Sequence, residues 1–193
     1  MLAFISRILM KLGGWKISQS IPKGVKKCVI VVAPHTSNLD YFWGRLGFFV
    51  IRVRVRFLIK KEAFFWPVGG LVKAWGGIPV DRQKNNRMVD YVAGLFDQHD
   101  SLYVVVTPEG TRSRVEHWKR GFYYIALKAK VPLALAYLDY KKKEVGVGRM
   151  FEPTGDYKAD LAVIQDFYKD KVPRHPEKFN LFRVTRESVN SEH

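Results

Sequence analysis

Apolar residues follow two different spacings along the chain, and the two alternate. Short continuous apolar runs bounded by turn-forming residues are typical of strands buried on both faces. They predict strands near residues 27–33, 55–60, 76–82, 101–106, 132–137 and 145–151. Between these runs, apolar residues recur with helical periodicity and predict helices near residues 38–51, 86–98, 122–130 and 157–170. Strands that alternate with helices predict an α/β fold, with a mostly parallel central sheet flanked by helices.

The rest of the chain gives no sign of a second domain. We find no internal repeat, low-complexity tract or linker, so residues 1–193 are expected to form one domain with a substantial core. The segment between the second and third strands contains Pro67, Gly69 and Gly70 and is expected to be irregular. From Pro173 onward the chain is rich in proline and charge, which predicts a strap or tail over residues 173–193.

Residues 1–17 have an amphipathic pattern of their own. One face of a helix here would carry five aliphatic side chains, those of Leu2, Ile5, Ile8, Leu9 and Leu12. Such a helix suits a membrane surface, but a helix packed on the core has the same pattern. Arg7 would interrupt the apolar region of a signal peptide, so we expect the segment to be retained. No uncharged apolar run approaches the roughly 20 residues that span a bilayer, so no transmembrane segment is expected.

The chain carries a formal charge of +15, from 33 Lys and Arg against 18 Asp and Glu. This excess predicts an anionic partner such as nucleic acid, phospholipid headgroups, a phosphorylated substrate or an acidic carrier protein. The aromatic fraction of 14% favours lipid, because aromatic rings are common where headgroups meet acyl chains. The single cysteine, Cys28, excludes a disulfide within the chain, favours an intracellular location, and is expected to be a buried structural thiol.

Three polar clusters follow predicted strand ends: PHTSNLD, GGIPVDR and TPEGTRSR. Loops beyond the carboxyl ends of parallel strands meet at one edge of the sheet, so the clusters are expected to converge. In the third cluster, Gly110 lets a ligand approach the backbone, Thr111 offers a hydroxyl, and Arg112 offers a planar donor suited to phosphate. Glu109 would orient an arginine or cap a helix, and Arg82 in the second cluster would add a positive contact. The alternative is that both clusters are solvated turns whose arginines pair with surface acids.

The first cluster contains His35 and, five positions later, Asp40. Ser37 or Asn38 is a good helix N-cap, which places His35 in a turn between strand and helix and Asp40 in the first helical turn. A neutral imidazole can take a proton from a hydroxyl that attacks a carbonyl, while a carboxylate on the other ring nitrogen stabilises the imidazolium. A histidine and an acid at this separation can also be a purely structural pair.

Other chemistries find little support in the residue pattern. The chain has no G-x-S-x-G nucleophile elbow, no H-E-x-x-H motif and no cysteine pair. We therefore expect no metal and no other cofactor. Without a protein nucleophile, the acceptor hydroxyl itself is expected to attack, which suits direct transfer of an activated acyl group.

The order of these blocks resembles the phospholipid/glycerol acyltransferase superfamily, typified by the lysophosphatidic acid acyltransferases. The family's H-x4-D block is similar to residues 35–40 and its E-G-T-R-S block to residues 109–113. Its second block is similar to KKEAFFWPVGGLVKAWGGIPVDR and its fourth to VPLALAYL, so that the resemblance covers about residues 28–138. Two features depart from the family: Pro34 stands where asparagine is frequent, and the chain is short, with one modest amphipathic segment.

The resemblance implies a glycerol-3-phosphate acyltransferase-like fold and an acyl-CoA or acyl-carrier-protein donor. The implied acceptor is the hydroxyl of a lysophospholipid, most simply 1-acylglycerol-3-phosphate, which would give phosphatidic acid. His35 is implied as general base and Asp40 as its partner. The residues implied at the acceptor phosphate are Arg82, Glu109, Gly110, Thr111 and Arg112.

An apolar groove is expected to hold the acyl chain, since each methylene removed from water contributes about 0.8 kcal/mol. Two aromatic runs are candidates for its lining, residues 41–43 and 64–66. Such runs also serve as core, and the second run, flanked by lysines, would alternatively dip into a membrane.

The resulting hypothesis is a cytoplasmic O-acyltransferase, peripheral on the inner face of the membrane. Its partners would be an anionic lysolipid, an acyl thioester or acyl-carrier protein, and the membrane surface, but not nucleic acid. Two alternatives remain open. One is acylation of an amino-acid-derived lysolipid, because Arg112 fits a carboxylate as well as a phosphate. The other, in a different class, is a basic nucleic-acid-binding module, which the charge favours although no reader motif is present.

Overall fold

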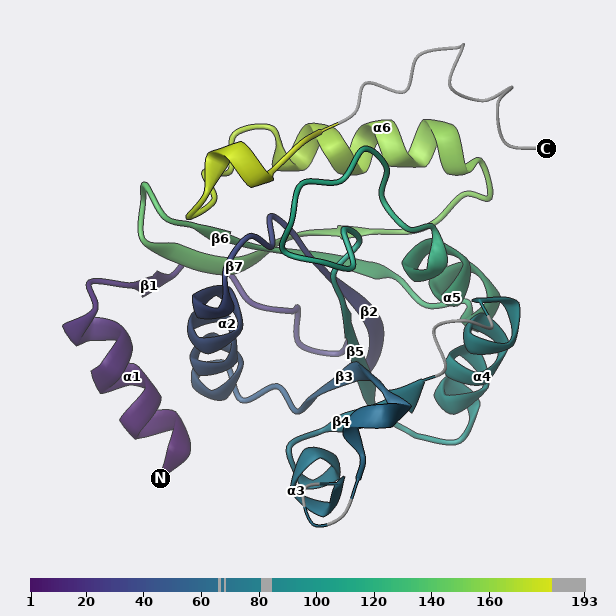
Figure 1. Cartoon of the computed structure of the whole chain (residues 1–193), viewed down its shortest axis with the longest axis horizontal. Coiled ribbons are helices and arrows are strands. Elements are labelled where there is room, and N and C mark those ends of the chain that lie inside the picture. The colour runs from purple at the N-terminus through teal and green to yellow at the C-terminus, as the bar shows by residue number, and fades with distance from the viewer. Residues whose placement is uncertain (66, 68, 81–84, 182–193) are drawn as a thin grey trace.

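The computed structural model of the chain describes residues 1–65, 67, 69–80 and 85–181. In this part of the chain seven strands form one sheet, in the order β1-β7-β6-β2-β5-β3-β4 (Figure 1). The strands are β1 (Lys16–Ile17), β2 (Lys27–Val32), β3 (Val55–Lys60), β4 (Gly77–Val80), β5 (Leu102–Val106), β6 (Leu133–Asp139) and β7 (Glu144–Phe151). The helices are α1 (Leu2–Leu12), α2 (Asn38–Val50), α3 (Gly69–Ala74), α4 (Asn85–Asp97), α5 (Gly121–Ala129) and α6 (Tyr157–Tyr168), with short 3-10 turns η1 (Lys61–Ala63) and η2 (Pro176–Lys178).

Neighbouring strands are parallel except for β6 and β7, which form an antiparallel pair. The predicted α/β fold with a mostly parallel sheet is therefore confirmed. Each predicted strand and helix has a counterpart in the structure, although β4 is described only to Val80 and the rest of the predicted strand at 76–82 lies outside the described residues.

Two elements depart from the sequence-based expectation. The segment expected to be irregular contains α3, whose first residue, Gly69, donates its N–H to the carbonyl of Phe65 at 2.7 Å. β1 has only two residues, and it forms because Lys16 and Ile17 pair with Glu144 and Val145 of β7. A strand this short has no periodicity of its own, so only its distant partner defines it.

Helices cover both faces of the sheet, with α4, α5 and α6 on one face and α2 on the other (Figure 1). Along β2, Val29 and Val31 pack into the first layer, while Cys28 and Ile30 pack toward Phe48 of α2 in the second. All four strand residues are fully buried, which explains the continuous apolar run. Burial raises the pKa of the Cys28 thiol to about 12, so this cysteine is an unreactive core residue.

The helix α1 lies outside the main layers and packs along α2 (Figure 1). Met10 at its end and Trp15 just beyond it are buried beside Leu46 of α2. Its aliphatic stripe faces outward instead of into the core, since exposed side chains include Leu2, Phe4, Ile5, Ile8, Leu9 and Leu12. Among the described residues, no helix has both the length and the apolar character needed to cross a membrane.

The chain after α6 folds back across the sheet, as far as it is described. The carbonyl of Val172 accepts the N–H of Tyr140 at 2.8 Å, and the N–H of His175 donates to Thr36 Oγ1 at 3.2 Å. Phe179 and Leu181 pack against the core. Residues 173–181 are thus a strap that contacts the turn after β2, whereas residues 182–193 lie outside the described part.

Candidate active site

The turn between β2 and α2 carries His35. β2 ends at Val32, and α2 begins at Asn38 behind the N-cap residue Ser37, whose backbone is extended. Ser37 Oγ accepts the N–H of Leu39 at 3.2 Å, while the carboxylate of Asp40 reaches back to the N–H of Ser37. This capping box holds the start of the helix and places Asp40 within reach of the His35 ring.

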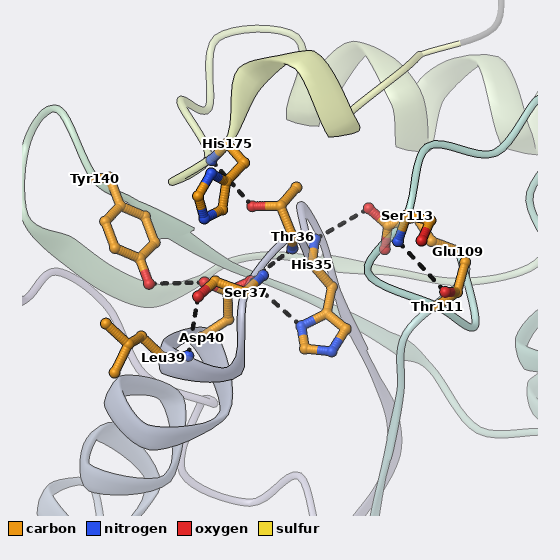
Figure 2. Close-up of polar contacts among 10 residues, drawn as sticks. All are labelled: His35, Thr36, Ser37, Leu39, Asp40, Glu109, Thr111, Ser113, Tyr140 and His175. Carbon is orange, nitrogen blue, oxygen red and sulfur yellow. Dashed lines mark hydrogen bonds and ion pairs between the residues drawn. The ribbon is translucent and has the colours of Figure 1, made fainter.

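Asp40 is the centre of the polar network in Figure 2 and is only 4% exposed. Its Oδ2 accepts the N–H groups of Thr36 and Ser37 at 2.7 and 2.8 Å and lies 3.4 Å from Nδ1 of His35. Its Oδ1 accepts the hydroxyl of Tyr140 at 2.7 Å. Burial by itself raises the pKa of Asp40, but these four contacts outweigh it and hold the pKa below its usual range. Asp40 is therefore a carboxylate at neutral pH.

The carboxylate controls what the imidazole of His35 can do. With Nδ1 turned toward Asp40, Nε2 is the ring nitrogen left to accept a proton. The His35 side chain is 19% exposed and lines a cavity of about 730 Å³. A ring that is reachable from a cavity and oriented by a carboxylate has the geometry of a general base.

Glu109 lies on the other side of the His35 turn (Figure 2). Its Oε1 accepts the backbone N–H of His35 at 3.0 Å, and Oε2 has no hydrogen-bond partner among the described residues. The side chain is 3% exposed and is not part of the cavity wall. Burial raises the pKa of Glu109 to about 8; the backbone N–H of His35 lowers it, and nearby Asp40 raises it further. Glu109 thus holds the His35 turn. The sequence had suggested that it orients an arginine or caps a helix, and the resemblance implied a place at the acceptor phosphate.

The residues after Glu109 face the same cavity as His35. Gly110, Thr111 and Arg112 line it, and so does Lys119 from further along the loop. Gly110 has a φ of +65°, and a Cβ at this position would lie 2.9 Å from Cε of Lys119. The positive φ favours glycine at this bend, whereas the flexible end of the Lys119 side chain could move away from a Cβ. The structure brings three predicted anion-binding residues together with His35 and adds Lys119, which the sequence reasoning missed.

The inner part of the cavity is apolar and runs between α2 and the sheet. Its wall there includes side chains from α2 and its C-cap residue and from β5, β6 and β7, namely Phe48, Ile51, Val105, Ala136 and Val147. A second group of lining residues, Leu58, Val80, Met88, Phe122 and Ile125, belongs to the core on the other face of the sheet, below α4 and α5. The cavity is thus polar at His35 and apolar beyond it.

The aromatic residues suggested as the lining of an acyl groove lie in different surroundings. Tyr41 lines the cavity, whereas Trp43 stacks on Trp15 at the end of α1, with ring centroids 5.2 Å apart. Phe65 is 60% exposed and does not contribute to the wall. Trp66 and the predicted phosphate ligand Arg82 lie outside the described residues.

Comparisons with known proteins identify a family and a similar fold. A family model described as Acyltransferase matches residues 16–136, a span that includes the His35 turn and the Glu109 loop. The fold is similar to the crystal structure of the 1-acyl-sn-glycerophosphate (LPA) acyltransferase PlsC from Thermotoga maritima, with a TM-score of 0.59 and 16% identity over 86% of this chain and 74% of that chain. At this identity the likeness concerns the fold. Comparison with curated proteins gives no match.

Proposed function

The chain belongs to the acyltransferase family, and from this premise we propose that it transfers a fatty acyl group from an acyl thioester to the hydroxyl of a lysophospholipid. One observation carries the proposal. His35, oriented by Asp40, and the turn at Gly110, Thr111 and Arg112 line one cavity, although the two segments are more than seventy residues apart in the chain. A base and an anion site in one cavity are what acylation of an anionic lysolipid requires.

The reaction proceeds in one active site without a covalent acyl-enzyme. Nε2 of His35 takes the proton of the acceptor hydroxyl as that oxygen attacks the thioester carbonyl. Asp40 stabilises the imidazolium that forms. The tetrahedral intermediate then collapses, the carbon–sulfur bond breaks, and the thiolate takes the proton from His35. The products are an ester and a free thiol.

The side chains at the polar end of the cavity favour an acceptor with an anionic headgroup. Arg112 offers a planar fork of donors, Lys119 a second cation and Thr111 a hydroxyl. We assign the acceptor as 1-acylglycerol-3-phosphate, which would give phosphatidic acid; the fold similarity to the 1-acyl-sn-glycerophosphate (LPA) acyltransferase of Thermotoga maritima supports the assignment. An amino-acid-derived lysolipid would present a carboxylate to the same cations. Arg82 joins this group on the sequence resemblance alone.

The acyl chain is proposed to occupy the apolar part of the cavity under α2. Phe48, Ile51 and Val147 would remove its methylenes from water, each contributing about 0.8 kcal/mol. The donor is either acyl-CoA or acyl-carrier protein, and no metal or other cofactor takes part in the proposed steps.

The outward-facing stripe of α1 supports a peripheral attachment to the inner face of the membrane. Six exposed apolar side chains on one helix, in a chain of net charge +15, suit the surface of an anionic bilayer. The lysolipid acceptor would then reach the active site directly from the bilayer to which the enzyme is attached.

The deciding experiment is a transfer assay with the purified full-length chain. Palmitoyl-CoA and palmitoyl-acyl-carrier protein are offered with 1-acylglycerol-3-phosphate or an amino-acid-derived lysolipid, and the products are identified by mass spectrometry. We expect phosphatidic acid, a rate unchanged by a metal chelator, and a fall of about a hundredfold to ten-thousandfold in His35→Ala. Absence of transfer with every pair, or full activity in His35→Ala, would refute the proposal.

A further inference from the structure

Tyr140 contacts the His35–Asp40 pair from a part of the chain that the family match does not reach. It follows β6 directly and stands four positions beyond residue 136, where the match ends. Its hydroxyl donates to Oδ1 of Asp40 at 2.7 Å (Figure 2). Among the described contacts of Asp40, this is the one made by Oδ1, because Thr36, Ser37 and His35 all face Oδ2.

The tyrosine is itself held from several directions. Its ring meets the ring of Trp15 edge to face, with centroids 4.9 Å apart, and its N–H donates to the carbonyl of Val172 at 2.8 Å. Burial and the contact with Asp40 raise the pKa of the Tyr140 hydroxyl well above its usual value, although Arg174 opposes this. The hydroxyl therefore stays protonated and acts as a donor at any pH at which the enzyme would be assayed.

The helix cap does not explain this contact. The capping box of α2 uses Oδ2, through the N–H of Ser37, and would be complete without a partner on Oδ1. A donor on Oδ1 acts together with the N–H groups of Thr36 and Ser37 on Oδ2 to fix the rotation of the carboxylate about its Cβ–Cγ bond. This rotation determines whether Oδ2 faces Nδ1 of His35. We propose that Tyr140 is a positioning residue that holds Asp40 in the orientation in which it aligns His35 as the base. The proposal rests on the proposed function, which it deepens.

The test is Tyr140→Phe, which removes the hydroxyl and keeps the ring. We expect kcat to fall about tenfold to a hundredfold, the range typical of losing a partner that orients a reacting group. KM for the lysolipid is expected to change less than about twofold, because Tyr140 is not part of the cavity wall. In an Asp40→Asn background the same substitution is expected to change kcat little, since the carboxylate it positions is gone.

Tyr103→Phe is the matched control. Tyr103 is also a partly buried tyrosine, and its hydroxyl donates to the carbonyl of Val25 at 2.8 Å, at the opposite end of the sheet. Loss of that hydroxyl is expected to leave kcat unchanged. Comparing the thermal unfolding of the two variants separates a loss of stability from a loss of alignment.

A second readout does not depend on activity. The titration of the Asp40 carboxyl carbon is followed by 13C NMR, with Asp40→Asn to assign the signal. Three titratable groups, His35, Tyr140 and Glu109, influence this carboxyl. Tyr140→Phe removes only the Tyr140 hydroxyl and leaves the other two groups in place. We expect the pKa of Asp40 to be higher in Tyr140→Phe than in the wild type and unchanged in Tyr103→Phe.

The outcomes separate the two proposals. Turnover of Tyr140→Phe within twofold of an active wild type, an equal loss in the Asp40→Asn background, or an unaltered Asp40 titration would each overturn the role of Tyr140. A wild-type protein that transfers no acyl group would overturn the proposed function instead, and the carboxyl titration would then decide on Tyr140.

Discussion

At the scale of single residues, His35 lies between two carboxyl groups whose pKa values are shifted in opposite directions. Asp40 faces its ring and has a lowered pKa, so it is ionised at neutral pH. Glu109 accepts its backbone N–H and has a pKa raised to about 8, so it is largely protonated there. A neutral Glu109 does not repel an anionic acceptor in the neighbouring cavity, which suits a residue that only holds the turn.

This difference predicts the behaviour of Glu109→Gln. The amide oxygen of glutamine can accept the N–H of His35 as the acid does, so kcat at pH 7 is expected to stay within about threefold of the wild type. Glu109→Ala, which leaves that N–H without its acceptor, is expected to lower kcat about tenfold to a hundredfold. Steady-state rates of both variants are the measurement, and Glu116→Gln on the exposed part of the same loop is the control. A Glu109→Gln enzyme as impaired as Glu109→Ala would show that the acid itself is needed.

The sequence pattern was informative for part of this site. The N-cap at Ser37 and the spacing of His35 and Asp40 placed both side chains at one helix start, and the structure shows them there. Tyr140 could not be predicted, because it lies 100 residues from Asp40 and nothing in its own neighbourhood marks it. Glu109 could be singled out but not assigned, since its burial depends on how the whole loop packs.

At the scale of elements, periodicity predicted the long helices and strands that carry their own apolar pattern. Helices such as α2 and α4, with 13 residues each, carry a clear apolar stripe. The helix α3 was missed because Pro67, Gly69 and Gly70 are turn signals. The strand β1 was missed because it is defined by its pairing with the distant β7. The sequence predicted a strap or tail over residues 173–193, of which 173–181 are described, but the contact of this segment with Thr36 arises from packing and could not be predicted.

The stripe of α1 leads to a prediction about this helix. Ile5→Glu combined with Ile8→Glu places two charges among exposed side chains that are 45% accessible each. Binding to vesicles containing anionic phospholipid is expected to weaken at least tenfold, because burial of one such side chain contributes about 1.5–3 kcal/mol. Sedimentation with vesicles measures the effect.

Two comparisons make this result specific. Tyr91→Glu, at an exposed position of α4, is the control and is expected to bind as the wild type does. The thermal unfolding of the α1 variant should match the wild type, since neither isoleucine is buried. Unweakened vesicle binding by the α1 variant would rule out this face as the membrane contact.

At the scale of the whole molecule, the buried acids make stability depend on pH in opposite ways. Glu109 has a folded-state pKa of about 8 against an ordinary value of 4.5, so its contribution is fully present below pH 4.5 and is lost as the pH rises toward 8. Asp40 has a lowered pKa, so its contribution is present at neutral pH and is lost as the pH falls through its folded-state pKa.

The Glu109 part of this dependence can be isolated. The free energy of unfolding in urea is measured from pH 5 to pH 9 for the wild type and for Glu109→Gln. We expect the wild type to lose stability relative to the variant across this range, because only the wild type must release a proton from a buried site. Parallel curves for the two proteins would contradict the raised pKa of Glu109.

The indole of Trp15 lies against Trp43 on one face and against Tyr140 at an edge. It follows directly on the outward-facing helix, and it touches the tyrosine that holds Asp40. Tryptophan emission responds to the immediate surroundings of the indole. The emission of Trp15 is therefore expected to change both when α1 contacts a lipid surface and when the alignment of His35 changes. Because the chain has five tryptophans, the difference in emission between the wild type and Trp15→Phe would report whether the two events are linked.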